Sequence, residues 1–342
     1  MDGRKMKRGI TIKKKFKQKR KKINRTKKPS KIAKTINESV KHHNYKALMA
    51  EYLEEDLSKT SDTFTSLIER LDQVDEYFEK NKANSSTEPN ELEVAFGISL
   101  KSKKVSRNWN IVQDNLSRTL RSILNNTDQN LRIIIAGHEK PNIEEINHER
   151  VTWLCVSFPP PKYISQYSID KFRKRRVIGA YLRNTGFSGY FMPLDADDWI
   201  HYRFVEFIRT APVSDAFILN KGFMANLKNK QVWVKDRFFI GCGSSSVFYF
   251  SNMDFPRSSR MTGVRKAKFK WAIWPHHKVT LFLENKDYRM VDFPFVTWVL
   301  FHGDNNSIIK RKLSSKVSPQ NFNVIPDNLE DRFYKYFKIK NF

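Results

Sequence analysis

Short apolar segments alternate with amphipathic helix patterns between residues 94 and 194, and this alternation restricts the possible folds most. The pattern predicts strands at 94–100, 131–136, 151–158 and 190–194, and helices at 110–124 and 170–184. One face of the first helix collects its apolar residues, which are Val112, Leu116, Leu120, Ile123 and Leu124. A crossover helix that covers a sheet has such a face. We therefore predict an α/β fold, Rossmann-like, with a mostly parallel sheet flanked by helices.

A strongly basic segment precedes this region. The chain has a formal net charge of +27, and its first 35 residues hold 17 Lys/Arg and a single acid, Asp2. Such a segment repels itself and has few apolar groups, so we expect residues 1–30 to form a disordered basic tail. Its field would attract a polyanion, either an anionic membrane surface or a nucleic acid. A solubilising arm with no fixed partner is the alternative.

Residues 31–90 are expected to form a helical accessory segment and a linker. Apolar residues recur there at spacings of 3, 4, 3 and 4, namely Phe64, Leu67, Leu71, Val74 and Phe78. This stripe favours packing on the neighbouring domain over dimerisation, and the oligomeric state stays open. The polar stretch 81–90 marks a domain boundary. We place the main domain at 91–315 and a C-terminal extension at 316–342.

The cysteine and hydropathy patterns restrict where in the cell we expect the protein. Cys155 and Cys242 show neither zinc-ligand nor disulfide-framework spacing. The basic start is not followed by an apolar signal region, and no run of about 18 apolar residues occurs. We expect a cytoplasmic protein, at most peripheral on the inner face of the membrane.

Three carboxylates follow the strand predicted at 190–194: Asp195, Asp197 and Asp198. In α/β proteins ligands bind beyond the carboxyl ends of the strands, and Asp oxygens suit Mg²⁺ or Mn²⁺. Such an ion would bridge the phosphates of a nucleotide diphosphate. Alternatively, Asp197 or Asp198 caps a helix-like segment at 199–208, which explains one acid but not three. Pro193 lacks an amide hydrogen and is expected at a bulge or where strand pairing ends.

Residues 92 to about 308 resemble the family 2 glycosyltransferases of the GT-A fold. The resemblance rests on the strands at 94–100 and 131–135, the helix sequence 116–123, and above all Met192-Pro-Leu-Asp-Ala-Asp-Asp-Trp199, which is similar to the family's LDADD signature. A bacterial subgroup is similar in Gly241-Cys-Gly-Ser-Ser245 and in Gly303-Asp-Asn-Asn-Ser307. Nothing before residue 91 resembles the family.

The resemblance implies roles for the acidic motif and for a histidine. Asp195 would contact the nucleotide ribose or the metal, Asp197 would ligate the metal, and Asp198 would orient the motif or act on the acceptor side. His302 would complete the metal shell, with His276 and His277 as competitors.

It also implies contacts to the donor. Lys171, Lys174 and Arg175 would lie near the diphosphate, a role that suits Lys and Arg chemically. The family's base-reading Asp after the second strand is replaced by Gly137-His138-Glu139, so Glu139 is the candidate substitute. This departure leaves the nucleotide open.

An inverting transferase also needs a carboxylate base for the acceptor hydroxyl. Asp198, Asp254 and Glu284 are our candidates, with Asp287 and Asp292 as further groups. Glu284 follows the His276-His277 segment, about where the resemblance puts a base.

The sequence therefore predicts a glycosyltransferase that uses Mn²⁺ or Mg²⁺ and moves a sugar from a nucleotide diphosphate sugar to a glycan, a lipid-linked acceptor or a protein. The alternative is a nucleic-acid-binding protein that acts through its basic tail, with the α/β domain as a degenerate scaffold.

Overall fold

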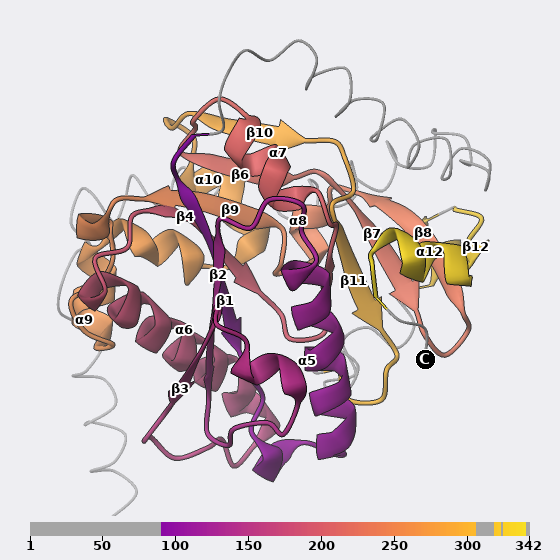
Figure 1. Ribbon diagram of the computed structural model, residues 1–342, viewed down its shortest axis with the longest axis horizontal. Coiled ribbons are helices and arrows are strands. Elements are labelled where there is room, and N and C mark those ends of the chain that lie inside the picture. Colours follow the sequence, from indigo (N-terminus) through magenta and orange to yellow (C-terminus); the bar gives the residue numbers. More distant parts are fainter. Residues whose placement is uncertain (1–89, 306–317, 323, 340–342) are drawn as a thin grey trace, which may run out of the picture. The chain divides into compact units, whose positions relative to one another are not determined.

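The computed structural model describes residues 90–305, 318–322 and 324–339 (Figure 1). The predicted basic tail, the apolar stripe at 64–78 and the last two residues of the motif 303–307 lie outside the described residues. The partners expected for the tail therefore stay predictions.

The main sheet has seven strands in the order β10-β6-β9-β4-β1-β2-β3. Their bounds are β1 Glu93–Ser99, β2 Leu131–Gly137, β3 Val151–Cys155, β4 Gly189–Leu194, β6 Ala216–Leu219, β9 Ser246–Phe250 and β10 Tyr288–Val291. All neighbours run parallel except β9, which is antiparallel to both β4 and β6. The predicted α/β class with a mostly parallel sheet is confirmed.

Two long helices, α5 (Trp109–Leu124) and α6 (Tyr167–Asn184), lie on opposite faces of this sheet (Figure 1). Successive residues of a strand point to opposite faces, which divides β1 between them. Phe96 belongs to the same core cluster as Leu116 and Leu120 of α5, whereas Ala95 belongs to a second cluster with Ile178 of α6. The sheet is therefore buried on both sides, as its apolar strands require.

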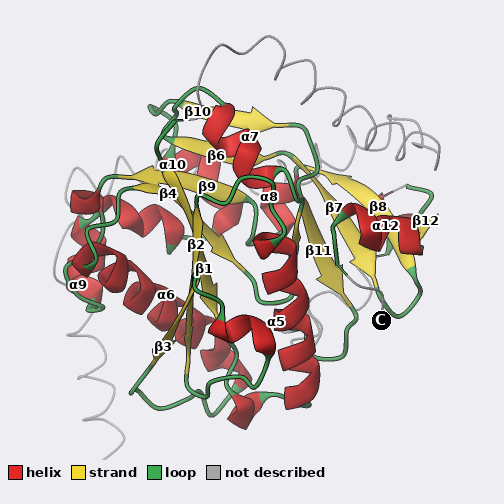
Figure 2. Ribbon diagram, in the orientation of Figure 1, coloured by secondary structure: helices red, strands yellow, loops and turns green. Residues whose placement is uncertain are grey.

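A second sheet has the order β12-β8-β7-β11-β5 (Figure 2). Its strands are β5 Trp199–Ile200, β7 Lys221–Asn226, β8 Gln231–Asp236, β11 Val296–Leu300 and β12 Asp327–Asn328. The shorter helices are α7 Phe204–Thr210, α8 Phe238–Gly241, α9 Met261–Lys266, α10 Val279–Phe282 and α12 Asp331–Tyr336. Single 3-10 turns are η1 Lys103–Val105, η2 Glu144–Asn147, η3 Ile164–Gln166, η4 Asn252–Asp254, η5 Lys268–Ala272, η6 His276–Lys278 and η7 Pro319–Phe322.

The described part of the expected C-terminal extension packs on the second sheet. β12 pairs with β8, and Phe333 and Phe337 share a core with Trp199 and Phe223. Both sheets thus bury aromatic side chains against elements from distant parts of the chain.

Two local predictions need correction. The segment 199–208, predicted as helix-like, begins as strand β5, which pairs with β11, and helix α7 starts at Phe204 behind the N-cap position Arg203. Asp197 and Asp198 are therefore not its cap. The strand predicted at 151–158 ends at Cys155, before Pro159 to Pro161, whose rings cannot donate to a ladder.

Pro193 lies inside β4 without a bulge on the β1 side, where register continues from Gly189 through Leu194. On the β9 side the pairing ends at Phe191. The missing amide hydrogen is therefore tolerated where pairing ends on one side of the strand, as predicted.

In the part of the chain that the structure describes, no helix combines the length and apolar character needed to cross a membrane.

His201 is a fully buried histidine in an aromatic surrounding. Its Nδ1 accepts a hydrogen bond of 3.2 Å from the backbone N–H of Arg203, and no partner for Nε2 is found among the described residues. Rings that lie within 6 Å of its own are Tyr202, Phe293, Phe295, Tyr336 and Phe337. Burial lowers the pKa of His201 well below its ordinary value of 6.5, and the charges of Arg203 and Lys338 act in the same direction.

We predict that His201 makes stability depend on pH. The unfolded chain binds the proton more readily than the fold does, so the free energy of unfolding is highest above pH 6.5 and falls as pH decreases below it. The loss approaches about 1.4 kcal/mol per pH unit. In His201→Asn, the amide oxygen can take over the bond from Arg203 without titrating. Urea unfolding between pH 8 and pH 5 should show a steeper loss in the wild type, and parallel slopes would contradict the prediction.

Candidate functional site

A cavity of about 400 Å³ lies beyond the carboxyl ends of β1 and β4. Its acidic lining comes from Asp195, Asp197 and Asp304, and its basic lining from Lys101 and Lys171. Other lining residues are Ser99, Leu100, Val112, Asn115, Tyr167, Ser168, Ala196, Gly241, Gly243, His276, Trp298, His302 and Asn305. Ligands of open α/β sheets bind at this edge, and the size suits a small organic molecule.

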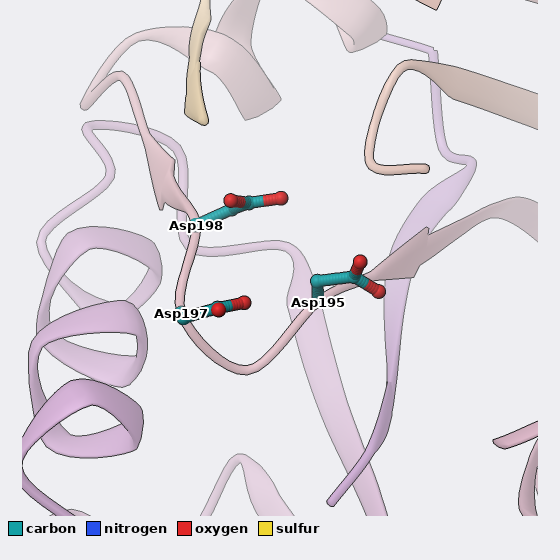
Figure 3. A group of neighbouring side chains, drawn as sticks. All are labelled: Asp195, Asp197 and Asp198. Carbon is teal, nitrogen blue, oxygen red and sulfur yellow. The ribbon is translucent and has the colours of Figure 1, made fainter. Parts of the chain in front are cut away.

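The three aspartates predicted as a site lie on one short turn after β4 (Figure 3). The backbone N–H of Asp198 donates to the carbonyl of Asp195 at 3.3 Å, which closes the turn. One carboxylate oxygen from each residue lies within 4.8 Å of the others. Asp195 and Asp197 line the cavity, whereas Asp198 is 1% exposed and does not.

Asp198 is held by two parts of the chain, the loop before β9 and strand β11. Its Oδ2 accepts from Ser244 Oγ at 2.6 Å and from Cys242 Sγ at 3.5 Å, and its Oδ1 accepts from the Val299 N–H at 3.2 Å. Burial raises the pKa of this carboxyl well above its ordinary value, and Asp197 and Asp195 add to the rise. Asp198 therefore holds the acidic turn in place through buried hydrogen bonds and does not face the cavity.

Asp197 is oriented by the loop that follows β11. Its Oδ2 accepts from His302 Nε2 at 2.7 Å and from Asn305 Nδ2 at 3.2 Å. The Asn115 amide lies 2.8 Å from His302 Nδ1 and donates to it, so the ring proton lies on Nε2. Both ring nitrogens of His302 are thus engaged, and His302 supports Asp197 from the side.

Asp195 contacts the ammonium of Lys171, from the first turns of α6. Burial acts to raise the pKa of Asp195, but Lys171, with Arg175 and His276, holds it below its ordinary value. The backbone N–H of Asp195 donates to Ser244 Oγ at 2.9 Å, the same hydroxyl that donates to Asp198. Ser244 therefore joins both ends of the acidic turn.

His276, from η6, is another lining residue of the cavity. Its Nδ1 lies 2.7 Å from the carbonyl oxygen of Phe239. A carbonyl only accepts, so Nδ1 carries the proton and Nε2 is left as an acceptor. Burial lowers the pKa of His276. This histidine is thus set up to accept a hydrogen bond or a proton.

The other cations and the acid predicted for donor binding lie outside the cavity lining. Lys174 is fully buried and donates to Asp170 Oδ2 at 2.6 Å and to the Leu100 carbonyl at 2.7 Å. Glu139 accepts from Ser102 Oγ at 3.0 Å and from the Lys103 N–H at 2.9 Å, and so holds the η1 turn.

Arg175 is also buried, and its Nη1 donates to the Ala272 carbonyl at 2.7 Å. Burial lowers the pKa of Arg175 to about 10, against the opposing charge of Asp195. Its Nε and Nη2 have no hydrogen-bond partner among the described residues. Arg175 therefore supports Asp195 electrostatically from behind the cavity wall.

The candidate bases Asp254 and Glu284 are not brought to the cavity. Asp254 caps η4 by accepting from Ser251, and the neighbouring Asn252 bonds Ser188, which precedes β4. β4 has six residues and is about 20 Å long at 3.3 Å per residue, so Asp254 lies at the opposite end of the strand from the acidic turn. Glu284 is exposed after α10 and does not line the cavity. Asp292, a further group, accepts from Asn220.

Asp304 is a cavity carboxylate to which sequence reasoning gave no role. It pairs with Lys101 at 2.9 Å and accepts from the Arg107 N–H at 3.2 Å. The sequence signal that could have pointed to Asp304 was its place in the motif 303–307, two residues after His302.

The donor set of the acidic turn fits a divalent cation. Asp195 and Asp197 present carboxylate oxygens to the cavity, and Asp198 lies close behind them. Oxygen ligands of this kind suit Mg²⁺, Mn²⁺ and Ca²⁺ alike, so the residues support such an ion without selecting one.

No protein-family model matches the sequence, and no curated protein matches it. Among solved structures, the chain is similar to HddC from Yersinia pseudotuberculosis, with 11% identity and a TM-score of 0.33 over 64% of this chain and 97% of HddC. At that TM-score the likeness carries no argument about function.

We predict that Ser244→Ala destabilises the fold by about 1–3 kcal/mol, because it leaves the Asp195 N–H without a partner and removes the shortest of the hydrogen bonds to the buried Asp198 carboxyl. Urea unfolding measures the loss. Ser246→Ala is the matched control, because the equally buried Ser246 hydroxyl has no hydrogen-bond partner among the described residues. Equal effects of the two substitutions would show that the Ser244 bonds contribute little.

Proposed function

We propose that this protein is a metal-dependent glycosyltransferase that takes a sugar from a nucleotide diphosphate sugar. One observation carries the proposal: two carboxylates of the acidic turn and two lysines surround a cavity of about 400 Å³ at the carboxyl ends of parallel strands. Carboxylates suit the cation, lysines suit phosphates, and the volume suits a nucleotide-sized ligand. The resemblance of the motif 192–199 to the family 2 signature supports the same reading.

Asp195 and Asp197 would hold the cation, with His302 and Asn305 keeping the Asp197 carboxylate in place. A bound divalent ion would neutralise the charge that develops on the diphosphate leaving group. Lys171, which contacts Asp195, and Lys101, which pairs with Asp304, would attract the phosphates. The sugar would pass to a hydroxyl of a glycan, a lipid-linked acceptor or a protein.

The acceptor hydroxyl must lose its proton as the new bond forms. Asp198, Asp254 and Glu284 do not line the cavity, so this role falls to a group that does. His276 offers Nε2 as an acceptor, and Asp304 offers a carboxylate paired with Lys101.

We predict that Asp197→Asn abolishes metal-dependent nucleotide binding, because one of the two carboxylates of the acidic turn that face the cavity becomes neutral. A thermal-shift panel of UDP, GDP, CDP, ADP and dTDP, with and without Mn²⁺, measures this. A ligand at about 100 times its Kd should raise the wild-type melting temperature by about 5 °C or more.

Glu284→Gln is the control, since it removes an exposed carboxylate outside the cavity lining and should keep the full Mn²⁺-dependent shift. An unchanged Mn²⁺-dependent shift in Asp197→Asn would contradict the proposed function.

A further inference from the structure

Lys171 and Asp195 form an ion pair that is open to the cavity. Their side chains are 30% and 29% exposed, and both residues line the cavity wall. Gly243 lies beside the pair: a Cβ at that position would be 3.5 Å from Asp195 Oδ2 and 3.6 Å from Lys171 Nζ. The absence of that side chain keeps the pair accessible to a ligand.

The ammonium of Lys171 is held less firmly than that of Lys174, one turn further along α6. Lys174 is fully buried and bonds both Asp170 and the Leu100 carbonyl. For Lys171, Asp195 is the hydrogen-bond partner found among the described residues, although an ammonium has three donors. Lys171 can therefore exchange Asp195 for another anion without leaving a buried charge unpaired.

The same carboxylate would be a ligand of the cation under the proposed function. A lysine ammonium on Asp195 neutralises the negative charge that would otherwise attract a divalent ion. The ammonium and the metal ion therefore compete for this carboxylate. A diphosphate in the cavity offers the ammonium an alternative anionic partner. Lys101 differs, because its partner is Asp304, a carboxylate outside the acidic turn.

We propose that Lys171 is a place-holder cation: it neutralises Asp195 while the site is empty and moves to the diphosphate when the donor binds, which releases Asp195 to the metal. The proposal rests on the proposed function. It makes the binding of the metal and of the nucleotide diphosphate cooperative, each being weak without the other. By linkage the nucleotide then strengthens metal binding by the same factor as the metal strengthens nucleotide binding.

The test measures Mn²⁺ affinity by electron paramagnetic resonance of the free ion, first with Mn²⁺ alone and then with the nucleoside diphosphate that gives the largest Mn²⁺-dependent thermal shift. Lys171→Met removes the ammonium and keeps most of the side-chain length. Lys101→Met removes an equal charge from the same cavity, so it controls for the general electrostatic effect. Lys171→Arg keeps a cation beside Asp195.

We expect Lys171→Met to bind Mn²⁺ alone at least about fivefold more tightly than Lys101→Met does, the lower end of typical coupling between sites. The nucleotide should then strengthen Mn²⁺ binding less in Lys171→Met than in the wild type, while Lys171→Arg stays close to the wild type. A gain in affinity over the wild type cannot arise from misfolding of Lys171→Met.

Two failures are distinguishable. Equal Mn²⁺ affinities of the two methionine variants, in a protein whose wild type binds nucleotide in a Mn²⁺-dependent way, would overturn the place-holder role alone. A wild type without any Mn²⁺-dependent nucleotide binding would overturn the proposed function and this inference with it.

Discussion

A buried carboxylate, that of Asp198, accepts hydrogen bonds from Ser244, Cys242 and Val299, which belong to the loop before β9 and to β11. The bond from Val299 joins the turn after β4, in the main sheet, to the second sheet, and those from Ser244 and Cys242 join it to the loop before β9. A carboxyl removed from water needs such partners, and each partner is held in place by the carboxyl in return. The positions of Asp195 and Asp197 at the cavity follow from this arrangement.

The three aspartates thus differ in role because their surroundings differ. Asp198 is buried and satisfied by the protein, Asp197 is steadied by His302 and Asn305, and Asp195 faces a lysine. The three side chains gather on one short turn (Figure 3), and they acquire different roles because each meets different neighbours. Only the two at the cavity wall are available to a ligand.

A similar division separates the cations of α6. Lys171 reaches the cavity, Lys174 neutralises Asp170 in the interior, and Arg175 binds the Ala272 carbonyl while its charge acts on Asp195. A helix turns by about 100° per residue, so three cations within five positions point to different neighbours. A basic run on a helix therefore predicts charge near a site without telling which residue touches the ligand.

The sequence by itself determined the local elements and the place of the acidic turn. The apolar periodicity of 94–100, 110–124, 131–136 and 190–194 depends on near neighbours, and the carboxyl end of a parallel strand is where ligands bind. It did not predict β5, because a two-residue strand leaves no periodicity and forms only by pairing with β11.

Tertiary structure decided which groups surround the cavity. The partners of the acidic turn lie far along the chain: Ser244 is 46 residues from Asp198, Val299 is 101 residues from it, and His302 is 105 residues from Asp197. Asp254 and Glu284, predicted as bases, and Asp304, given no role, are all carboxylates whose sequence surroundings do not reveal which end of a strand they occupy. Only chain folding, which brings distant strand ends to one edge, distinguishes the carboxylate that faces the cavity from those that do not.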